Sequence, residues 1–503
     1  MLASIPSAIV IGVDGIPVTV EVHVGNGIPG LTIVGLPDAS CREARDRVRA
    51  AVMAAGITWP NRKITINLAP SDTRKVGSGL DLAMAVGVLV ACGELKADNV
   101  AGLAFVGELG LDGTVRPVPG VVPRVDAVAE DHVVVPWRSS ADAALVSGRT
   151  VHGVRTLREV FDALAQESRL WPLHPVPEPD VVEQVVADLA DVRGQDALCD
   201  ALELSAAGGH HLLMIGPPGA GKTMLASRLP GLLPDLDART AMETSRVHSA
   251  AGLTLGGLVT RPPFRAPHHS TTMVALVGGG SESMRPGEVS LASGGVLFLD
   301  ELGEFPPAVL DALRQPLEEG VIRVSRARFS AVLPARVLMV AAMNPCPCGE
   351  AGRPGACRCP DGLLARYRRR LSGPLLDRFD LRVHVDRPAV AALLGGEPGT
   401  PTAQRAERVL LARERARERG VEVNSQLGGA QLEEAAPLHI DAENLLKGAL
   451  TSGRLSARGL SRIRRVALTL ADLGGHRGPL LAPQIAAAMA LRVDVTGTNG
   501  IAA

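Results

Sequence analysis

Hydrophobic and polar residues alternate over residues 16–24, which predicts a β-strand with one buried face. Residues 38–55 have helical spacing, and the charged side chains of this helix, Arg47 among them, are expected on the solvent side. A second strand is predicted at residues 63–68 and a buried helix at residues 80–91. The first part of the chain therefore predicts a domain that mixes strands and helices.

The pattern changes after this domain. Four prolines within residues 166–186 cannot belong to a core element and predict a semi-rigid linker. Three short apolar runs beyond it have the length of buried strands: residues 212–215, 295–299 and 337–343. They predict an α/β core at residues 187–386, while alanine- and leucine-rich helices dominate residues 387–503. The expected fold class is α/β multidomain, with an α+β domain at residues 1–165, an α/β core and a small helical lid.

Composition narrows the class of protein. Of the 503 residues, 46% are hydrophobic and 21% are charged, which is ordinary for a globular protein. The net charge of −1 gives no global indication of nucleic acid, so any DNA contact must come from local patches. The longest apolar run, residues 80–92, contains Asp81 and is too short to span a bilayer, and the N-terminus lacks the basic segment of a signal peptide. We therefore expect a cytoplasmic protein without membrane contact.

A phosphate-binding motif directly follows the apolar run 212–215. It occupies eight consecutive positions: Gly216, Pro217, Pro218, Gly219, Ala220, Gly221, Lys222 and Thr223. In such a motif the glycines let backbone N–H groups curl around a phosphate, the lysine reaches the terminal phosphates and the threonine hydroxyl holds Mg²⁺. Because a strand precedes it and a helix start follows it, the motif predicts binding of ATP with Mg²⁺.

Two carboxylates follow the apolar run 295–299. Asp300 and Glu301 come where a strand of an α/β sheet ends, which is beside the phosphate site in such folds. We expect Asp300 to hold Mg²⁺ through water and Glu301 to polarise the attacking water as general base. The adjacent His268 and His269 could suggest a metal, but no ligands at suitable spacing accompany them. They are expected to have structural or hydrogen-bonding roles.

Cysteines form a third group. Seven cysteines in a cytoplasmic chain indicate thiols or metal ligands rather than disulfides. Four of them lie within 14 residues in a C-x-C-x₈-C-x-C arrangement: Cys346, Cys348, Cys357 and Cys359. A loop of this kind can wrap a tetrahedral site of four sulfurs, for which zinc is the expected occupant and iron–sulfur an alternative. Two alternatives for these four cysteines are free reduced thiols and a redox-active pair.

Several stretches of the chain resemble the Mg-chelatase-like YifB/ComM family. They include Gly35-Leu36-Pro37-Asp38, Asn67-Leu68-Ala69-Pro70, Gly107-Glu108-Leu109 and Leu313-Arg314-Gln315-Pro316, and the resemblance extends from about residue 10 to residue 495. It implies a Lon-protease-domain-like fold for residues 1–165, a P-loop AAA+ ATPase core for residues 187–386 and the small helical lid of such ATPases for residues 387–503.

The resemblance also implies roles for individual residues. Asn344 matches the polar residue that AAA+ proteins place beside the γ-phosphate, and residues 192–195 match the segment that packs beside the adenine. Arg378 matches the arginine finger that reaches the ATP site of a neighbouring subunit, so a hexameric ring is expected. In the lid, Arg458 is the expected γ-phosphate contact, with Arg465 as second choice.

A Lon-like fold raises the alternative of a peptidase. Lon-type chemistry needs a serine that a neutral lysine activates. The position of the nucleophile falls on Gly79, one residue after Ser78, and the position of the lysine falls near Val122. Without this base Ser78 is expected to be a turn residue, and peptidase activity is not expected.

Arginines mark a strand–turn–strand pattern just before the third apolar run: Arg323, Arg326 and Arg328. In the wider clade that includes MCM helicases, a hairpin at this position points into the pore of the ring, where a basic hairpin would follow a nucleic-acid backbone. An ordinary hairpin with solvated arginines is the alternative. The expected function is a hexameric AAA+ motor that translocates or branch-migrates DNA, as ComM-type proteins do in recombination or DNA uptake. A protein-remodelling ATPase and a magnesium-chelatase motor subunit are the alternatives.

Overall fold

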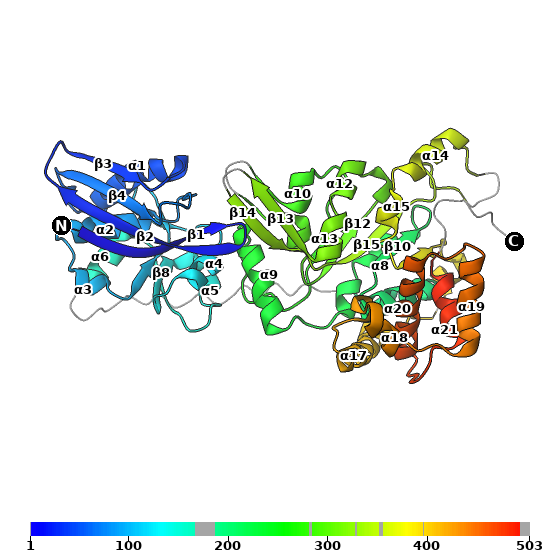
Figure 1. Ribbon diagram of the computed structural model, residues 1–503. Coiled ribbons are helices and arrows are strands. Elements are labelled where there is room, and N and C mark those ends of the chain that lie inside the picture. The colour runs from blue at the N-terminus through cyan, green and yellow to red at the C-terminus, as the bar shows by residue number, and fades with distance from the viewer. Residues whose placement is uncertain are drawn as a thin grey trace.

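The computed structural model describes residues 2–165, 187–280, 284–326, 329–351, 356–395 and 397–492. An N-terminal domain, a central domain built on a parallel sheet and a group of C-terminal helices follow one another along the molecule (Figure 1). The predicted linker at residues 166–186 lies outside the described residues. Within the described ranges, every helix falls short of the length or the hydropathy that a bilayer-spanning helix requires.

The N-terminal domain begins with a four-stranded sheet in the order β1-β2-β4-β3. Its strands are β1 (Leu2–Ile11), β2 (Asp14–Gly25), β3 (Gly30–Val34) and β4 (Lys63–Ala69). Buried and more exposed side chains alternate along β4, as predicted for a strand with one face on the core. Two helices share this core, α1 (Ala39–Ala54) and α2 (Asp81–Cys92), and α2 is buried along almost its whole length, as predicted.

A smaller parallel sheet completes this domain, in the order β5-β8-β9. Its strands are β5 (Leu103–Phe105), β8 (His132–Pro136) and β9 (Thr150–Val154), and an antiparallel pair, β6 (Glu108–Leu109) and β7 (Val115–Arg116), lies between them in sequence. The remaining helices of the domain are α3 (Ala97–Val100), α4 (Val121–Ala127), α5 (Ser140–Ala143) and α6 (Leu157–Ala165).

The prediction that Arg47 faces solvent is wrong. Its Nε donates to Oδ2 of the buried Asp81 at 2.7 Å, and the Arg47 side chain is only 17% exposed. Burial raises the pKa of Asp81 to about 6, although the hydrogen bond and charge of Arg47 act in the opposite direction. An unpaired carboxylate between α1 and α2 would cost several kcal/mol, so the guanidinium turns inward to pair with it.

A five-stranded parallel sheet organises the central domain, in the order β11-β12-β15-β10-β16. Its strands are β10 (Leu212–Ile215), β11 (Phe264–Arg265), β12 (Val296–Leu299), β15 (Leu338–Met343) and β16 (Leu381–His384). Every residue of β10, β12 and β15 is buried, because helices cover both faces of a parallel sheet. The three predicted apolar runs are these three central strands.

Helices and one hairpin surround this sheet. The helices are α7 (Asp196–Gly208), α8 (Lys222–Ala226), α9 (Ala238–Ala250), α10 (Met273–Val277), α11 (Glu288–Leu291), α12 (Pro307–Asp311), α13 (Arg314–Glu319), α14 (Asp361–Arg369) and α15 (Gly373–Leu376). The predicted hairpin lies between α13 and β15 and consists of β13 (Val321–Arg326) and β14 (Phe329–Pro334). It projects from the central domain on the side of the N-terminal domain (Figure 1).

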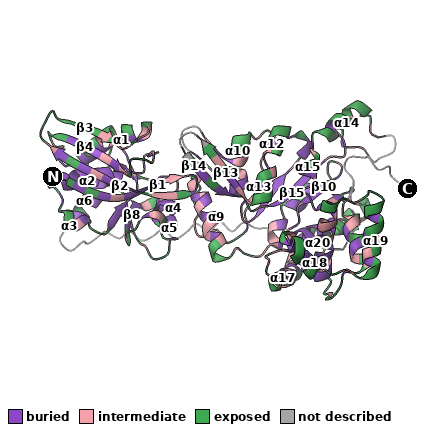
Figure 2. Cartoon of the chain, viewed as in Figure 1, coloured by how far each residue is buried: buried purple, intermediate pink, exposed green. Residues whose placement is uncertain are grey.

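The C-terminal helices share their hydrophobic core with the central sheet. They are α16 (Val390–Gly395), α17 (Thr402–Glu418), α18 (Gly429–Ala435), α19 (Ile440–Thr451), α20 (Ala457–Leu473) and α21 (Ala482–Ala490). One hydrophobic cluster joins Leu202 of α7, Val340 of β15 and Ile463 of α20, and Figure 2 shows buried residues on both α20 and β15. Glu203 of α7 accepts hydrogen bonds from Arg405 at 2.5 Å and Arg408 at 2.7 Å, which fixes α17 on the central domain.

The N-terminal domain contacts the central domain at two places. Helix α4 lies against α9, where the backbone N–H of Gly120 donates to the carbonyl of Ser249 at 2.7 Å. The turn between β1 and β2 meets the hairpin, because a Cβ at Gly12 would lie 3.0 Å from the Cβ of Ala331. Val13 and Leu333 belong to one hydrophobic cluster there. The hairpin is therefore packed against the N-terminal domain at its base.

Candidate nucleotide-binding site

The phosphate-binding motif forms the loop between β10 and α8, at the carboxyl edge of the sheet. Gly219 and Gly221 have φ values of +75° and +83°, a region that L side chains rarely adopt. Gly216 is needed for a different reason, because a Cβ there would lie 2.1 Å from the carbonyl oxygen of Val385. Two positive φ angles and one close backbone approach thus give the loop the path that a phosphate-binding loop requires.

Lys222 points back over this loop. Its Nζ donates to the carbonyl of Gly216 at 2.6 Å, to that of Pro217 at 3.0 Å and to Oδ1 of Asn344 at 3.3 Å. Burial lowers the pKa of Lys222, while the charges of Asp300 and Glu301 raise it. A partly desolvated ammonium with carbonyl partners is well placed to exchange them for phosphate oxygens, with which it forms stronger, charge-assisted bonds.

Thr223 and Asp300 meet across the sheet. The Thr223 hydroxyl donates to Oδ2 of Asp300 at 2.6 Å, although the two residues are 77 positions apart in the chain. A hydroxyl and a carboxylate are oxygen ligands of the kind that Mg²⁺ takes beside a bound triphosphate, directly or through water. The structure thus brings together the two residues that the sequence assigns to Mg²⁺.

Glu301 follows Asp300 in a strained turn. Its φ of +50° is one of two positive values among the non-glycine residues of the described chain. The backbone N–H of Glu301 donates to Oδ1 of Asp300 at 2.8 Å, and its carboxylate Oε2 lies 3.2 Å from Nδ1 of His269. Strained backbone of this type costs on the order of 1–3 kcal/mol and is concentrated at functional sites.

His269 belongs to this site, which the sequence did not indicate beyond a general hydrogen-bonding role. Its ring also packs edge-on against Phe305, with ring centroids 6.5 Å apart, and against His268 at 4.0 Å. His268 pairs with the Ser270 hydroxyl at 2.8 Å, and among the described residues the two histidines belong to no group of three or more metal-ligating side chains. Nδ1 of His269 lies within ion-pairing distance of the Glu301 carboxylate, and the two side chains form an ion pair when His269 is protonated.

Asn344 closes the other side of the loop. It follows β15 directly, and its side chain reaches Lys222 as described above. The hydroxyl of Tyr367 on α14 donates to the carbonyl oxygen of Asn344 at 3.3 Å. The Tyr367 ring packs so closely on Gly303 that a Cβ there would lie 2.6 Å from it. Tyr367 thus connects the end of β15 with the turn that follows Glu301.

Gln195 supports the loop from the adenine side of the predicted site. Its amide nitrogen donates to the carbonyl of Ala220 at 3.1 Å and to that of Asp386 at 2.7 Å. Residues 192–195, which the resemblance places beside the adenine, therefore contact the phosphate-binding loop itself.

Arg378 lies apart from the loop of its own chain. It follows α15 and pairs with the Glu318 carboxylate on α13, and its side chain is only 13% exposed. No hydrogen bond in the described part of the chain joins Arg378 to Gly216–Thr223. This position is compatible with a role at the site of another subunit.

Helix α20 carries both lid arginines that the resemblance assigns to the γ-phosphate, Arg458 and Arg465. Arg458 is exposed in the first turn of α20, and no hydrogen bond among the described residues connects it or Arg465 with the phosphate-binding loop. Arg462, one helical turn beyond Arg458, donates to Oδ1 of the buried Asp380 at 3.0 Å. Burial would raise the pKa of Asp380, but His210, Arg462 and His211 outweigh it and hold that pKa at about 2.

The basic hairpin is described in part. Arg323 is exposed and its Nε lies 3.4 Å from Oε2 of Glu319. Arg326 is the last residue of β13, and its side chain lies outside the described part of the structure, as does Arg328. Arg323 is therefore the one member of the predicted basic group whose surroundings are known.

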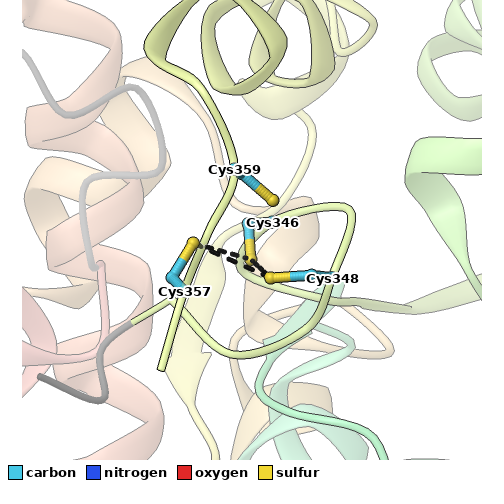
Figure 3. A group of neighbouring side chains, drawn as sticks. All are labelled: Cys346, Cys348, Cys357 and Cys359. Atoms are coloured by element: carbon cyan, nitrogen blue, oxygen red, sulfur yellow. Dashed lines mark hydrogen bonds between the residues drawn. The ribbon is translucent and has the colours of Figure 1, made fainter. Parts of the chain in front are cut away.

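The four clustered cysteines come together as the spacing predicts (Figure 3). Their sulfur atoms all lie within 4.8 Å of one another. Cys346 is buried and Cys348 is exposed, and all four thiols are free. The backbone N–H of Glu350 and the neighbouring thiols lower the pKa of Cys348 to about 6. The four side chains could hold a metal ion with four sulfur ligands.

Ser78, the residue considered as a peptidase nucleophile, has a carboxylate as its partner in the N-terminal domain. The hydroxyl of Ser78 donates to the carboxylate of Glu108. A Cβ at Gly79 would lie 2.8 Å from the guanidinium of the buried Arg124, so an arginine fills the space beside this position. The ammonium of the neighbouring Lys75 donates to the carbonyl of Thr73 at 2.7 Å. Ser78 therefore has no neutral lysine beside it among the described residues.

Three family profiles match the chain. The profile described as "Magnesium chelatase, subunit ChlI" matches residues 188–393, "Subunit ChlI of Mg-chelatase" matches residues 20–139, and "Magnesium chelatase, subunit ChlI C-terminal" matches residues 399–492. The first of these contains the whole phosphate-binding site described above, and the third contains the lid helices α17 to α21.

Similar proteins cover nearly the entire chain. An uncharacterized protein of Mycobacterium tuberculosis is 46% identical over 495 residues, 97% of both chains. Competence protein ComM of Haemophilus influenzae is 42% identical over 505 residues, 98% of both chains, and the uncharacterized protein YifB of Escherichia coli is 42% identical over 467 residues, 92% of both. Shorter matches are to Lon protease 2 of Bacillus subtilis, 30% identical over 24% of this chain, and to the minichromosome maintenance protein MCM of Saccharolobus solfataricus, 24% identical over 38% of it.

Proposed function

The chain belongs to the Mg-chelatase ChlI-like family of AAA+ ATPases, as its motifs predict, and on that premise we propose that it is a ring-forming ATPase motor that acts on DNA. The observation that carries the ATPase half is the convergence of Lys222, Thr223, Asp300 and Asn344 at one edge of the sheet. The N-terminal domain of this proposal has a Lon-like fold without Lon-type catalysis.

The site supports hydrolysis of ATP by positioning and electrostatics. The loop backbone and Lys222 bind the phosphates, and Thr223 and Asp300 hold the Mg²⁺ that accompanies them. Glu301, whose carboxylate lies 3.2 Å from Nδ1 of His269, polarises the attacking water as general base. The side chain of Asn344 lies beside Lys222, where it can orient that water against the terminal phosphate. Bound Mg²⁺ supplies charge stabilisation at the phosphate oxygens.

Arg378 requires a second subunit in this proposal. A guanidinium that acts in trans stabilises the charge that develops on the transferred phosphoryl group and contributes about 10³–10⁵ in rate. In its own chain Arg378 pairs with Glu318, so a neighbouring ATP would compete with Glu318 for the same guanidinium. A closed ring, a hexamer in our proposal, gives every site such a neighbour.

The DNA half is supported by two observations. Arg323 is exposed on the hairpin that carries two further arginines in sequence, and basic groups at such a position bind phosphates without sequence preference. The full-length similarity to a protein named competence protein ComM supports a competence-related role, and we propose recombination or uptake of DNA as its setting. Branch migration or strand displacement driven by ATP is the activity that we propose.

The test is the rate of ATP hydrolysis with single-stranded, duplex and branched DNA and with an unfolded protein. We expect DNA to stimulate hydrolysis, and Arg323→Glu to weaken that stimulation while the basal rate remains. Arg417→Glu, at an exposed position of the lid helix α17, is the matched control. Fork migration should occur with wild-type protein and fail with Lys222→Ala and Glu301→Gln. Stimulation by unfolded protein alone would replace the proposal with a protein-remodelling ATPase, and stimulation by a porphyrin-chelating partner alone would replace it with a chelatase motor.

A further inference from the structure

The cysteine loop packs directly on the phosphate-binding loop. Gly349 lies between the second and third cysteines and has a φ of +78°. A Cβ at Gly349 would lie 2.5 Å from Cδ of Pro218 and 2.8 Å from its Cγ. Gly349 is buried although Cys348 beside it is exposed, so the inner side of this loop rests on the proline ring. The two loops therefore cannot move independently of each other.

A side-chain bridge adds a second connection. Arg387, just beyond β16, donates from Nη2 to Oε1 of Glu350 at 3.1 Å and from Nε to the carbonyl of Pro218 at 3.2 Å. One guanidinium thus binds the cysteine loop and the phosphate-binding loop at the same time. A planar guanidinium fixes the direction of both contacts, which a lysine could not do.

The chain that leaves the cysteine loop reaches the remaining parts of the site. It enters α14, whose Tyr367 donates to the carbonyl of Asn344 at 3.3 Å. Arg370, after the end of α14, donates to the carbonyl of Gly303 at 2.8 Å and to the Glu304 carboxylate at 3.0 Å. Residues that follow the cysteines therefore contact the end of β15 and the turn after Glu301. The cysteine loop is connected with all three segments that form the ATP site.

The geometry of the four sulfurs fits a tetrahedral ion. Sγ of Cys357 lies 3.7 Å from the sulfurs of both Cys346 and Cys348, and those two sulfurs are 3.3 Å apart. A zinc ion with Zn–S distances of about 2.3 Å separates its sulfur ligands by about 3.8 Å. The backbone N–H of Ala351 donates to Sγ of Cys346 at 3.2 Å, the kind of contact that stabilises a metal-bound thiolate. Zinc is the usual ion for four cysteines in a structural role.

We propose that Zn²⁺ bound by Cys346, Cys348, Cys357 and Cys359 fixes the cysteine loop on Pro218, so that occupancy of this metal site sets the affinity of the chain for ATP. The proposal rests on the assignment of the ATP site above, but on no statement about DNA. Without the ion, the two halves of the described loop are joined by weak thiol contacts, those of Cys357 with Cys346 and Cys348, each at 3.7 Å. The loop would then lose its fixed position, and with it the support for the phosphate-binding loop and Asn344.

The experiment measures metal content and ATP binding on the full-length protein without DNA. Wild-type protein should contain about one zinc per chain. The double variant Cys348→Ser/Cys359→Ser, which leaves the buried Cys346 in place, should retain about tenfold less zinc and bind a fluorescent ATP analogue about tenfold more weakly. Cys92→Ser, at the end of α2 in the N-terminal domain, is the control and should change neither quantity.

A second variant separates the coupling from folding. Arg387→Ala should retain zinc and the wild-type thermal transition, yet bind the ATP analogue about fivefold more weakly, because it removes the bridge to Pro218 and leaves the cysteines. Substoichiometric zinc, or iron in its place, would overturn the metal assignment. Unchanged ATP affinity in both the cysteine variant and Arg387→Ala would overturn the coupling. If these results hold and DNA fails to stimulate hydrolysis, the proposed DNA function falls and the zinc proposal stands.

Discussion

The ammonium of Lys222 lies 3.3 Å from the side-chain oxygen of Asn344, although 122 residues separate them in the chain. Because β10 and β15 are adjacent parallel strands, the residues that follow each of them meet at the same edge of the sheet. β15 lies between β10 and β12 in this sheet, so the residues that follow β10 and β12 also end at this edge, and Thr223 contacts Asp300 there. The order of the strands in the sheet therefore determines which residues meet to form the ATP site.

Replacement of Lys222 tests the central contact of this site. Lys222→Ala removes the cation that exchanges backbone carbonyls for phosphate oxygens, so we expect ATP hydrolysis to fall by about 100-fold or more. Water can replace the ammonium at the carbonyls of Gly216 and Pro217 and at the side chain of Asn344. The midpoint of thermal unfolding should therefore change little. Nucleotide binding and hydrolysis rates measure the effect. Lys447→Ala, an exposed lysine on α19, is the control and should hydrolyse ATP like wild type.

Glu301→Gln should separate binding from hydrolysis. The amide keeps the size of the side chain and can still contact His269, but it cannot polarise water as a base. We expect ATP affinity to persist and the rate of hydrolysis to fall by about 10²–10⁴. Single-turnover kinetics distinguish the two quantities. An equal loss of ATP binding and hydrolysis in this variant would show that Glu301 acts elsewhere.

Arg378→Ala should lower hydrolysis by about 10³ when all subunits carry it, because the finger of the neighbouring subunit is missing. Mixing it with Lys222→Ala subunits gives a sharper test. In a random equimolar ring, about a quarter of the interfaces combine an intact loop with an intact arginine, so about a quarter of the wild-type rate should return. Two inactive variants that stay inactive on mixing would place Arg378 at the site of its own chain instead.

Two glycines of the loop should respond differently to alanine. At Gly216 a Cβ would lie 2.1 Å from the carbonyl oxygen of Val385, so Gly216→Ala must displace β10 from β16 and should abolish nucleotide binding. Gly219 has a positive φ but nothing within 4 Å of its ideal Cβ. Gly219→Ala should cost only about 1 kcal/mol of backbone strain and leave measurable binding. Titration with an ATP analogue compares them directly. Similar losses in both variants would contradict this account.

His152 predicts how the N-terminal domain responds to acid. Burial and then the charge of the neighbouring His132 lower the pKa of His152 from 6.5 to about 4. Between these two values the unfolded chain binds a proton that the native chain does not. The stability that neutral His152 contributes is therefore complete above pH 6.5 and is lost as the pH falls toward 4.

At pH 5 this loss is about 2 kcal/mol, which corresponds to a fall of about 6 °C in the midpoint of thermal unfolding. His152→Gln is neutral at every pH and should reduce the difference between midpoints at neutral pH and at pH 5. His23→Gln, at an exposed position of β2 in the same domain, serves as the control. The interpretation fails if His152→Gln keeps the full wild-type pH dependence.

The sequence determined the features that depend on neighbours in the chain. Four consecutive apolar residues before Gly216 specify a buried strand, and the glycines after it specify the path of the loop, since both effects act over a few residues. The cysteine cluster was predictable for the same reason, because its four ligands lie within one loop. These local motifs also occur in the same order in a known family, and that resemblance predicted the domains of the whole chain.

Only the tertiary structure decided which of these pieces touch. His269 reaches Glu301, Arg378 pairs with Glu318, and Gly349 rests on Pro218. None of these contacts can be predicted from the spacing of residues along the sequence, because each depends on how separate strands and loops pack at one edge of the sheet. Arg47 shows the same limit, since its helical position predicted solvent while the buried charge of Asp81 on another helix turned it inward. Local periodicity fixes the elements of this protein, and long-range packing and desolvated charges fix its site.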